Sequence, residues 1–136
     1  MRIFLDANIL FSAAKSDGAI RQLLGLLLDA GHVCVIDEFV VAEARRNLVA
    51  KYPKAVSELD SMVLAIGVNP FASDANLIPE VVWLPEKNRP VLASAIRLRC
   101  DALLTGDRTH FGVGYGKAFA GVTIYSPRSL AEAIAG

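Results

Sequence analysis

Residues 88–107 read NRPVLASAIRLRCDALLTGD, a helical pattern followed by a short apolar strand and an aspartate. After Pro90, apolar residues recur at helical spacing as far as Ile96. The run 102–105 then reads as a buried strand. Gly106 allows a sharp backbone turn there, which would aim Asp107 out of the sheet.

The rest of the chain repeats this alternation of strand and helix. Strands are expected at 2–5, 32–36, 102–105 and 121–125, with short extended pieces at 68 and 81–84. Helices are expected at 19–30, 37–51, 53–66, about 90–99 and from 127 onward. Strands that are apolar throughout and alternate with helices indicate a parallel sheet covered on both faces. We therefore expect one domain over residues 1–136, with a three-layer α/β/α fold around a mostly parallel sheet.

Composition excludes several classes of protein. The 136 residues include 14 Lys and Arg against 14 Asp and Glu, and 54% are hydrophobic. This balance argues against a disordered chain and against a globally basic protein that coats nucleic acid. No stretch of about 18 apolar residues predicts a membrane span. Cys34 and Cys100 lie in or beside apolar runs and are expected to be buried, reduced thiols of a cytoplasmic protein.

The mean hydropathy of +0.43 is high for a soluble monomer. It favours a partner chain over part of the apolar surface, and we expect a homodimer.

Three acids are the candidate functional residues. Asp6 directly follows the first strand, and Asp107 follows the strand at 102–105. Ligands bind beyond the carboxyl ends of parallel strands, so these two carboxylates converge if their strands are neighbours. Glu43 lies beside the apolar stripe of the helix at 37–51. Taken singly, each acid also has an ordinary structural explanation, since an Asp after a strand often forms a turn or caps a helix.

Carboxylates that meet in one place repel each other unless a divalent cation neutralises them. Ligand sets made only of oxygen suit Mg²⁺ or Mn²⁺. Such an ion can activate water and stabilise charge on a phosphate, so this chemistry fits phosphodiester hydrolysis.

Three segments together resemble the PIN-domain family. They are LDANILFSA at 5–13, VVAEARRNL at 40–48 and NRPVLASAIRLRCDALLTGDRTHF at 88–111. The resemblance implies a PIN-like fold and a Mg²⁺- or Mn²⁺-dependent endoribonuclease that acts on RNA. Asp6, Glu43 and Asp107 match the family's acids and would be both metal ligands and catalytic residues. Many bacterial members are toxins of toxin–antitoxin pairs, so an antitoxin protein is an expected partner.

The chain departs from the family pattern at Asn88, where the family usually has a further acid. Asn88 could complete the metal shell weakly through its amide oxygen or through water. Glu86 could instead reach in from the preceding loop, or Asn88 could be only a helix N-cap. The lost negative charge argues against a two-metal site in particular. It also motivates a second hypothesis, a catalytically weakened PIN-fold module that acts by binding RNA or protein.

Other polar residues are expected to play supporting roles. Asn8 would hold the Asp6 carboxylate or its loop, and Thr105 would do the same for Asp107. His110 is more consistent with a structural role than with phosphate contact. Basic residues that lie near the acids in sequence could hold RNA, although such residues are ordinarily solvated surface side chains. They are Arg45, Arg46, Lys87, Arg89, Arg108 and Lys117. Aromatic residues make up only 7%, so no extended base-stacking platform is expected.

Overall fold

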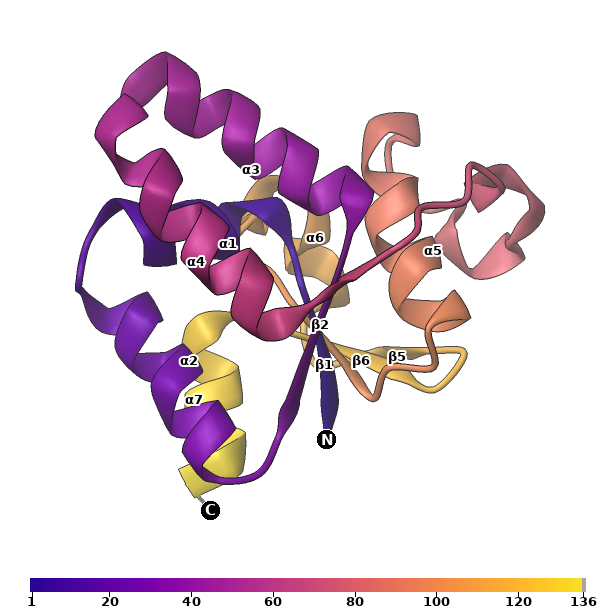
Figure 1. Ribbon diagram of the computed structural model, residues 1–136. Coiled ribbons are helices and arrows are strands. Elements are labelled where there is room, and N and C mark those ends of the chain that lie inside the picture. Colours follow the sequence, from indigo (N-terminus) through magenta and orange to yellow (C-terminus); the bar gives the residue numbers. More distant parts are fainter. Residues whose placement is uncertain (136) are drawn as a thin grey trace.

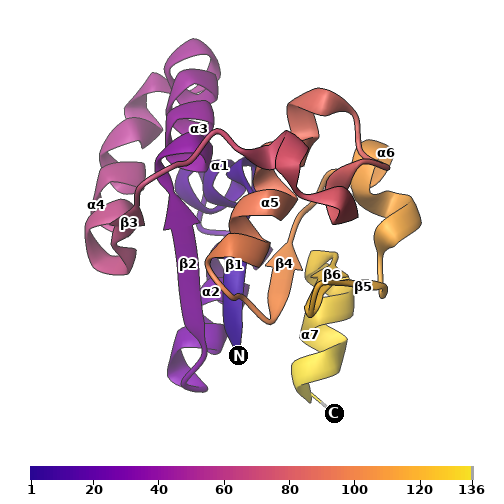
Figure 2. The ribbon, with the colours of Figure 1, turned by 90° about the vertical axis from the view of Figure 1, so that its right-hand side faces the viewer.

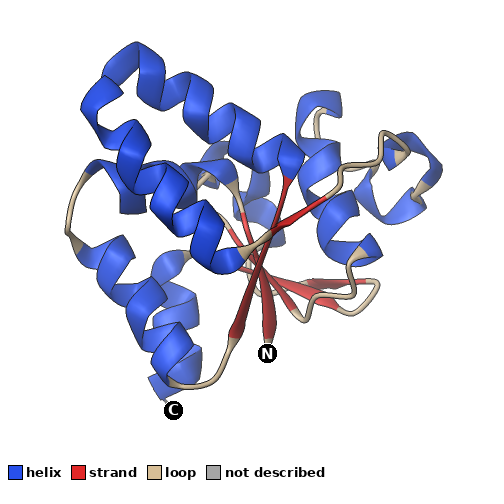
Figure 3. Cartoon of the chain, viewed as in Figure 1, coloured by secondary structure: helices blue, strands red, loops and turns tan. Residues whose placement is uncertain are grey.

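A six-stranded sheet forms the centre of the computed structural model, which describes residues 1–135. The strand order is β3-β2-β1-β4-β6-β5, and every neighbouring pair is parallel except β5 with β6. The strands are β1 (Arg2–Leu5), β2 (Val33–Asp37), β3 (Val68–Asn69), β4 (Ala102–Leu104), β5 (Ala118–Phe119) and β6 (Val122–Tyr125). Figure 3 shows them as the red core of the molecule.

Helices cover both faces of this sheet. Figure 1 shows α2 and α7 against one face and α5 against the other, and the view in Figure 2 shows α5 in front of β1 and β4. The α-helices are α1 (Ala7–Lys15), α2 (Ala19–Asp29), α3 (Glu38–Lys51), α4 (Val56–Ile66), α5 (Arg89–Arg97), α6 (Arg108–Phe111) and α7 (Pro127–Ala135). Short 3-10 helices are η1 (Pro53–Ala55), η2 (Ala75–Leu77), η3 (Pro79–Val81), η4 (Glu86–Asn88) and η5 (Gly112–Gly114). The predicted three-layer α/β/α class is confirmed.

The two central strands bring the expected functional edge together. Ile3, Phe4 and Leu5 of β1 are fully buried, as a strand covered on both faces requires. β1 pairs with β4 in a register that sets Leu5 opposite Leu104. The N–H of Asp6 donates to the carbonyl of Leu104 at 3.0 Å, which extends the pairing by one residue. The residues that follow both strands therefore leave the sheet at the same edge.

One predicted strand is wrong. Residues 81–84 were expected to be extended, but η3 ends at Val81 and a turn follows. Val81 and Leu84 are buried, whereas Val82 between them is exposed. This three-residue spacing belongs to a 3-10 turn, whose side chains repeat every third residue. The sequence pattern also did not predict α1, α6 or β5.

The two cysteines match their prediction, because Cys34 and Cys100 are both buried and free. Burial raises the pKa of each thiol to about 11, so both are poor nucleophiles at neutral pH. Within residues 1–135, no helix combines the length and the apolar character needed to cross a membrane.

Two glycines provide a test of the packing. A Cβ at Gly25, inside α2, would meet nothing within 4 Å, whereas a Cβ at Gly114 would lie 2.7 Å from Cη2 of Trp83. The Trp83 ring stacks on Phe119 at 4.8 Å between centroids, so it has little freedom to move.

We expect Gly25→Ala to raise the free energy of unfolding by about 0.5–1 kcal/mol. Gly114→Ala should lower it by about 1–3 kcal/mol. Urea unfolding followed by the fluorescence of the single tryptophan measures both, and a stable Gly114→Ala variant would contradict the packing around Trp83.

Candidate active site

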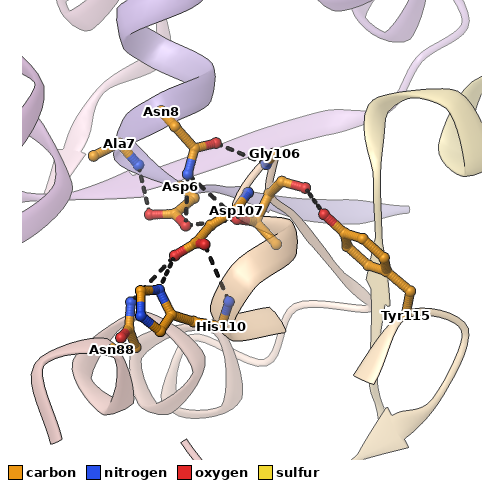
Figure 4. Close-up of polar contacts among 9 residues, drawn as sticks. Asp6, Ala7, Asn8, Asn88, Gly106, Asp107, His110 and Tyr115 are labelled. Carbon is orange, nitrogen blue, oxygen red and sulfur yellow. Dashed lines mark hydrogen bonds and ion pairs between the residues drawn. The ribbon is translucent and has the colours of Figure 1, made fainter. Parts of the chain in front are cut away.

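Asp6 is the most enclosed acid of the site, with 4% of its surface exposed. Figure 4 shows its polar contacts. It is the N-cap of α1, and its Oδ1 accepts a hydrogen bond from the N–H of Ala7 at 2.7 Å. Its Oδ2 accepts from the Thr105 hydroxyl at 2.7 Å and from the Asn8 amide at 3.1 Å. The carboxylate is therefore fixed by groups from α1 and from the segment after β4.

Enclosure changes the acidity of this group. Burial raises the pKa of Asp6 from 3.8 to about 6, and the nearby Glu43 carboxylate acts in the same direction. Hydrogen bonds from Thr105, the Ala7 N–H and Asn8 favour the charged form and oppose this rise in pKa. The net rise shows that desolvation outweighs the hydrogen bonds.

Thr105 and Asn8 link the two strand ends. The Thr105 hydroxyl accepts from the N–H of Asp107 at 3.1 Å while it donates to Asp6. The Asn8 carbonyl oxygen accepts from the N–H of Gly106 at 2.8 Å. Thr105 was expected to support the side chain of Asp107. Its hydroxyl contacts the carboxylate of Asp6 instead, and it contacts only the backbone of Asp107.

Asp107 lies three residues after the end of β4 and is the N-cap of α6. Its Oδ1 accepts from the His110 N–H at 3.2 Å, and its Oδ2 lies 2.8 Å from His110 Nδ1. The Asn88 amide donates to the same Oδ2 at 3.4 Å. A ring nitrogen and an amide group therefore face this carboxylate.

Asn88 is at the N-cap position of α5, but its side chain makes no capping hydrogen bond. The hypothesis that Asn88 serves only as a cap is therefore wrong at the side-chain level. Its amide nitrogen is directed to Asp107, and its Oδ1 is buried without a hydrogen-bond partner. Glu86, the alternative acid, is not among the residues that line the cleft.

The predicted acids share one cleft of about 180 Å³. Asp6 enters it from the end of β1, Asp107 from the end of β4, and Glu43 from α3. The other lining residues are Asn8, Lys87, Asn88, Val91 and His110. Across residues 1–135, however, no three His, Cys, Asp or Glu side chains are close enough to hold one metal ion as they stand. The acids converge on a common space without forming a closed ligand cluster.

This donor set suits a hard divalent cation. Asp6, Glu43 and Asp107 supply carboxylate oxygens, and Asn88 supplies a buried amide oxygen that lacks a partner. Buried polar atoms are rarely left unpaired, but the amide nitrogen of Asn88 faces Asp107, so the amide would have to turn to present Oδ1 to an ion beside Asp107. Oxygen donors of this kind fit Mg²⁺ or Mn²⁺ better than zinc.

The sequence pattern gives little sign of three residues at the site: His110 and Lys87, which line the cleft, and Tyr115, which contacts Thr105. His110 was assigned a structural role, yet its ring contacts Asp107 inside the cleft. Lys87 was one of several basic candidates, and it lines the cleft directly. Tyr115 donates from its hydroxyl to the carbonyl of Thr105 at 2.9 Å, a contact with no local sequence signal. For His110 the signal was its spacing, three residues after an aspartate that ends a strand.

The raised pKa of Asp6 predicts a pH-dependent effect on stability. Because this pKa is higher in the native state than in the unfolded state, the native state binds more protons between about pH 4 and pH 6. The contribution of Asp6 to stability therefore falls as pH rises through this window, by up to about 3 kcal/mol. Asp6→Asn removes this effect. The free energy of unfolding of the variant minus that of the wild type should therefore increase as pH rises from about 4 to about 7.5. Urea titrations at both pH values measure this, with the exposed Asp17→Asn as control. An equal difference at both values would contradict the burial argument.

No known family model matches the chain, and no curated protein matches it. Among solved structures, the crystal structure of VapBC2 from Rickettsia felis bound to a DNA fragment from their promoter contains a similar chain. The two chains are 17% identical, the match covers 93% of this chain and 98% of that chain, and the TM-score is 0.69. At this level of identity the comparison shows the fold alone. The fold is PIN-like α/β, in agreement with the sequence analysis.

Proposed function

We propose that this protein is a Mg²⁺- or Mn²⁺-dependent endoribonuclease that hydrolyses RNA phosphodiester bonds. One observation carries the proposal: Asp6, Glu43 and Asp107, from three separate elements, line the same cleft at the carboxyl edge of the sheet. The PIN-like fold and the matching sequence segments support it further.

In this proposal the residues that line the cleft have different roles. Asp6, Glu43 and Asp107 would hold the ion, with Asn88 as a weaker fourth ligand. A bound divalent ion there supplies an activated water and charge neutralisation at the phosphate. Thr105 and Asn8 keep the Asp6 carboxylate oriented through their hydrogen bonds. Lys87 lines the same cleft and brings a positive charge toward a phosphate.

Asp6→Asn tests this assignment. The substitution keeps the size of the side chain and removes its charge, so we expect Mn²⁺-dependent cleavage of a single-stranded RNA to fall at least about 100-fold. The assay measures initial rates with and without EDTA. The melting temperature at neutral pH should not fall, because the variant relieves a buried charge. The exposed Asp17→Asn variant, purified in the same way, should cleave like the wild type. Equal cleavage by Asp6→Asn would refute the assignment.

Two observations favour a second candidate, a PIN-fold module with weakened catalysis that binds RNA or protein. Asn88 stands where the family that the chain resembles usually has an acid, and the ligand set of the described residues is not closed. His110 and Asn88 already occupy one oxygen of Asp107, so a cation must compete with them.

Asn88→Asp separates the two candidates. The added charge should tighten Mn²⁺ binding by about tenfold or more, because a close charge pair in a partly buried site is worth more than about 1.4 kcal/mol. Isothermal titration calorimetry measures the affinity, and Gln22→Glu provides a control that adds the same charge at an exposed position on α2, outside this cleft. A parallel gain in cleavage identifies a weakened nuclease. If neither protein binds Mn²⁺ at millimolar concentration, the binding module is correct.

The proposal extends to a protein partner, namely an antitoxin that would make this chain the toxin of a toxin–antitoxin pair. Similarity of fold to a chain of VapBC2 supports this role. So does the apolar groove of about 230 Å³ between α2 and α4, which Leu24, Leu28, Met62 and Ile66 help to line. A second copy of this chain, as in the expected homodimer, is the other candidate to cover such a surface.

A further inference from the structure

Two helices next to the acidic cleft present facing rows of side chains. Figures 1 and 2 show α1 and α3 side by side. A second cleft of about 240 Å³ runs between them. Asn8 and Phe11 of α1, together with Glu43, Asn47 and Lys51 of α3, line it. Asn8 and Glu43 also line the acidic cleft, so the two clefts are adjacent.

The far end of this second cleft carries a basic and aromatic cluster. Lys15 Nζ lies 5.6 Å from the ring centroids of both Phe11 and Tyr52. Lys51 Nζ lies 5.9 Å from the Phe11 ring, and the Phe11 and Tyr52 rings meet edge to face at 5.8 Å. Together with Lys54, these residues form what we call the lysine–tyrosine patch (Phe11, Lys15, Lys51, Tyr52 and Lys54).

The patch extends into a third cleft and faces solvent. Lys15, Tyr52 and Lys54 line an open cleft of about 510 Å³, together with Glu58. Tyr52 is 47% exposed, so part of its side chain remains accessible to solvent beside Lys15 and Phe11. Within the part of the chain that the structure describes, no carboxylate oxygen lies within 4.0 Å of the ammonium group of Lys15, Lys51 or Lys54. Glu58 is paired instead with Arg21, at 4.0 Å.

The charge of the lining side chains therefore changes from negative to positive along the second cleft, from Glu43 to Lys51. Glu43 and Lys51 are eight residues apart on α3, which corresponds to about 12 Å along the helix axis. Lys15 and Lys54 lie with Lys51 in the patch, and within residues 1–135 none of the three is paired with a carboxylate, although the protein has no net charge. Phosphate oxygens are the natural partners of such lysines, and an exposed tyrosine ring stacks on a base of any sequence.

We infer that the lysine–tyrosine patch binds single-stranded RNA on one side of the bond that the acidic cleft would cleave. Lys15 and Lys51 contact backbone phosphates, and Tyr52 stacks on one base. The inference rests on the proposed ribonuclease function for its choice of ligand. Single-stranded RNA fits best, because a duplex keeps its bases stacked on each other and unavailable to Tyr52.

Binding measured without catalysis tests this inference. The probe is a fluorescein-labelled single-stranded RNA in EDTA, and fluorescence anisotropy gives its Kd. We expect the double variant Lys15→Gln/Lys51→Gln to weaken binding about tenfold or more. The slope of log affinity against log salt should become shallower by about 1.4, the value for two lost phosphate contacts on a single strand. Tyr52→Leu should weaken binding about fivefold or more, whereas Tyr52→Phe should retain it.

Arg99→Gln is the matched control, because it removes an exposed cation just before β4, at the opposite edge of the sheet. It should bind RNA like the wild type. Melting temperatures of all variants verify that they are folded.

The outcomes separate this inference from the proposed function. If the lysine double variant and Tyr52→Leu bind like the wild type, or if a duplex of the same sequence binds equally well, the inference is overturned. A wild-type protein that binds no RNA in EDTA overturns it as well. If the patch variants lose binding while the wild type never cleaves RNA in Mn²⁺, the patch is supported and the nuclease proposal fails.

Discussion

The buried carboxylate of Asp6 is the constraint on which the site depends. It lies at the end of the central strand β1, and three hydrogen bonds tie it to α1 and to Thr105 after β4. Those hydrogen bonds do not offset the cost of burying the charge, since the pKa of Asp6 is raised to about 6. A neutral side chain would stabilise the fold better here at neutral pH. A charge kept in such a place is typical of functional sites, where a cation or substrate supplies the missing interaction.

The polar groups around Asp6 differ in how well their hydrogen-bonding atoms are paired. Asp107 is contacted by His110 and Asn88, whereas the Asn88 carbonyl oxygen has no partner. The cleft therefore combines a fixed acid, an acid already paired and an unsatisfied oxygen.

Much of this arrangement was predictable from the sequence, for physical reasons. Asp6 and Asp107 each follow a buried strand, and parallel neighbouring strands bring such residues to one edge. Glu43 could be assigned to a helix face, but its entry into the cleft depends on the path of α3, which no local pattern records. The contact of His110 depends on α6, a single turn too short to show a helical period. Residues 81–84 were mispredicted because four consecutive apolar residues suit a strand and a 3-10 turn equally well.

The central claim is that Asp6, Glu43 and Asp107 bind one hard cation together. Anomalous diffraction from a crystal soaked in Mn²⁺ tests it most directly. We expect one manganese peak in the cleft, with an oxygen of each of the three acids within about 2.5 Å. A crystal soaked at millimolar Mn²⁺ that shows no peak there, or a peak bound by other residues, would contradict it.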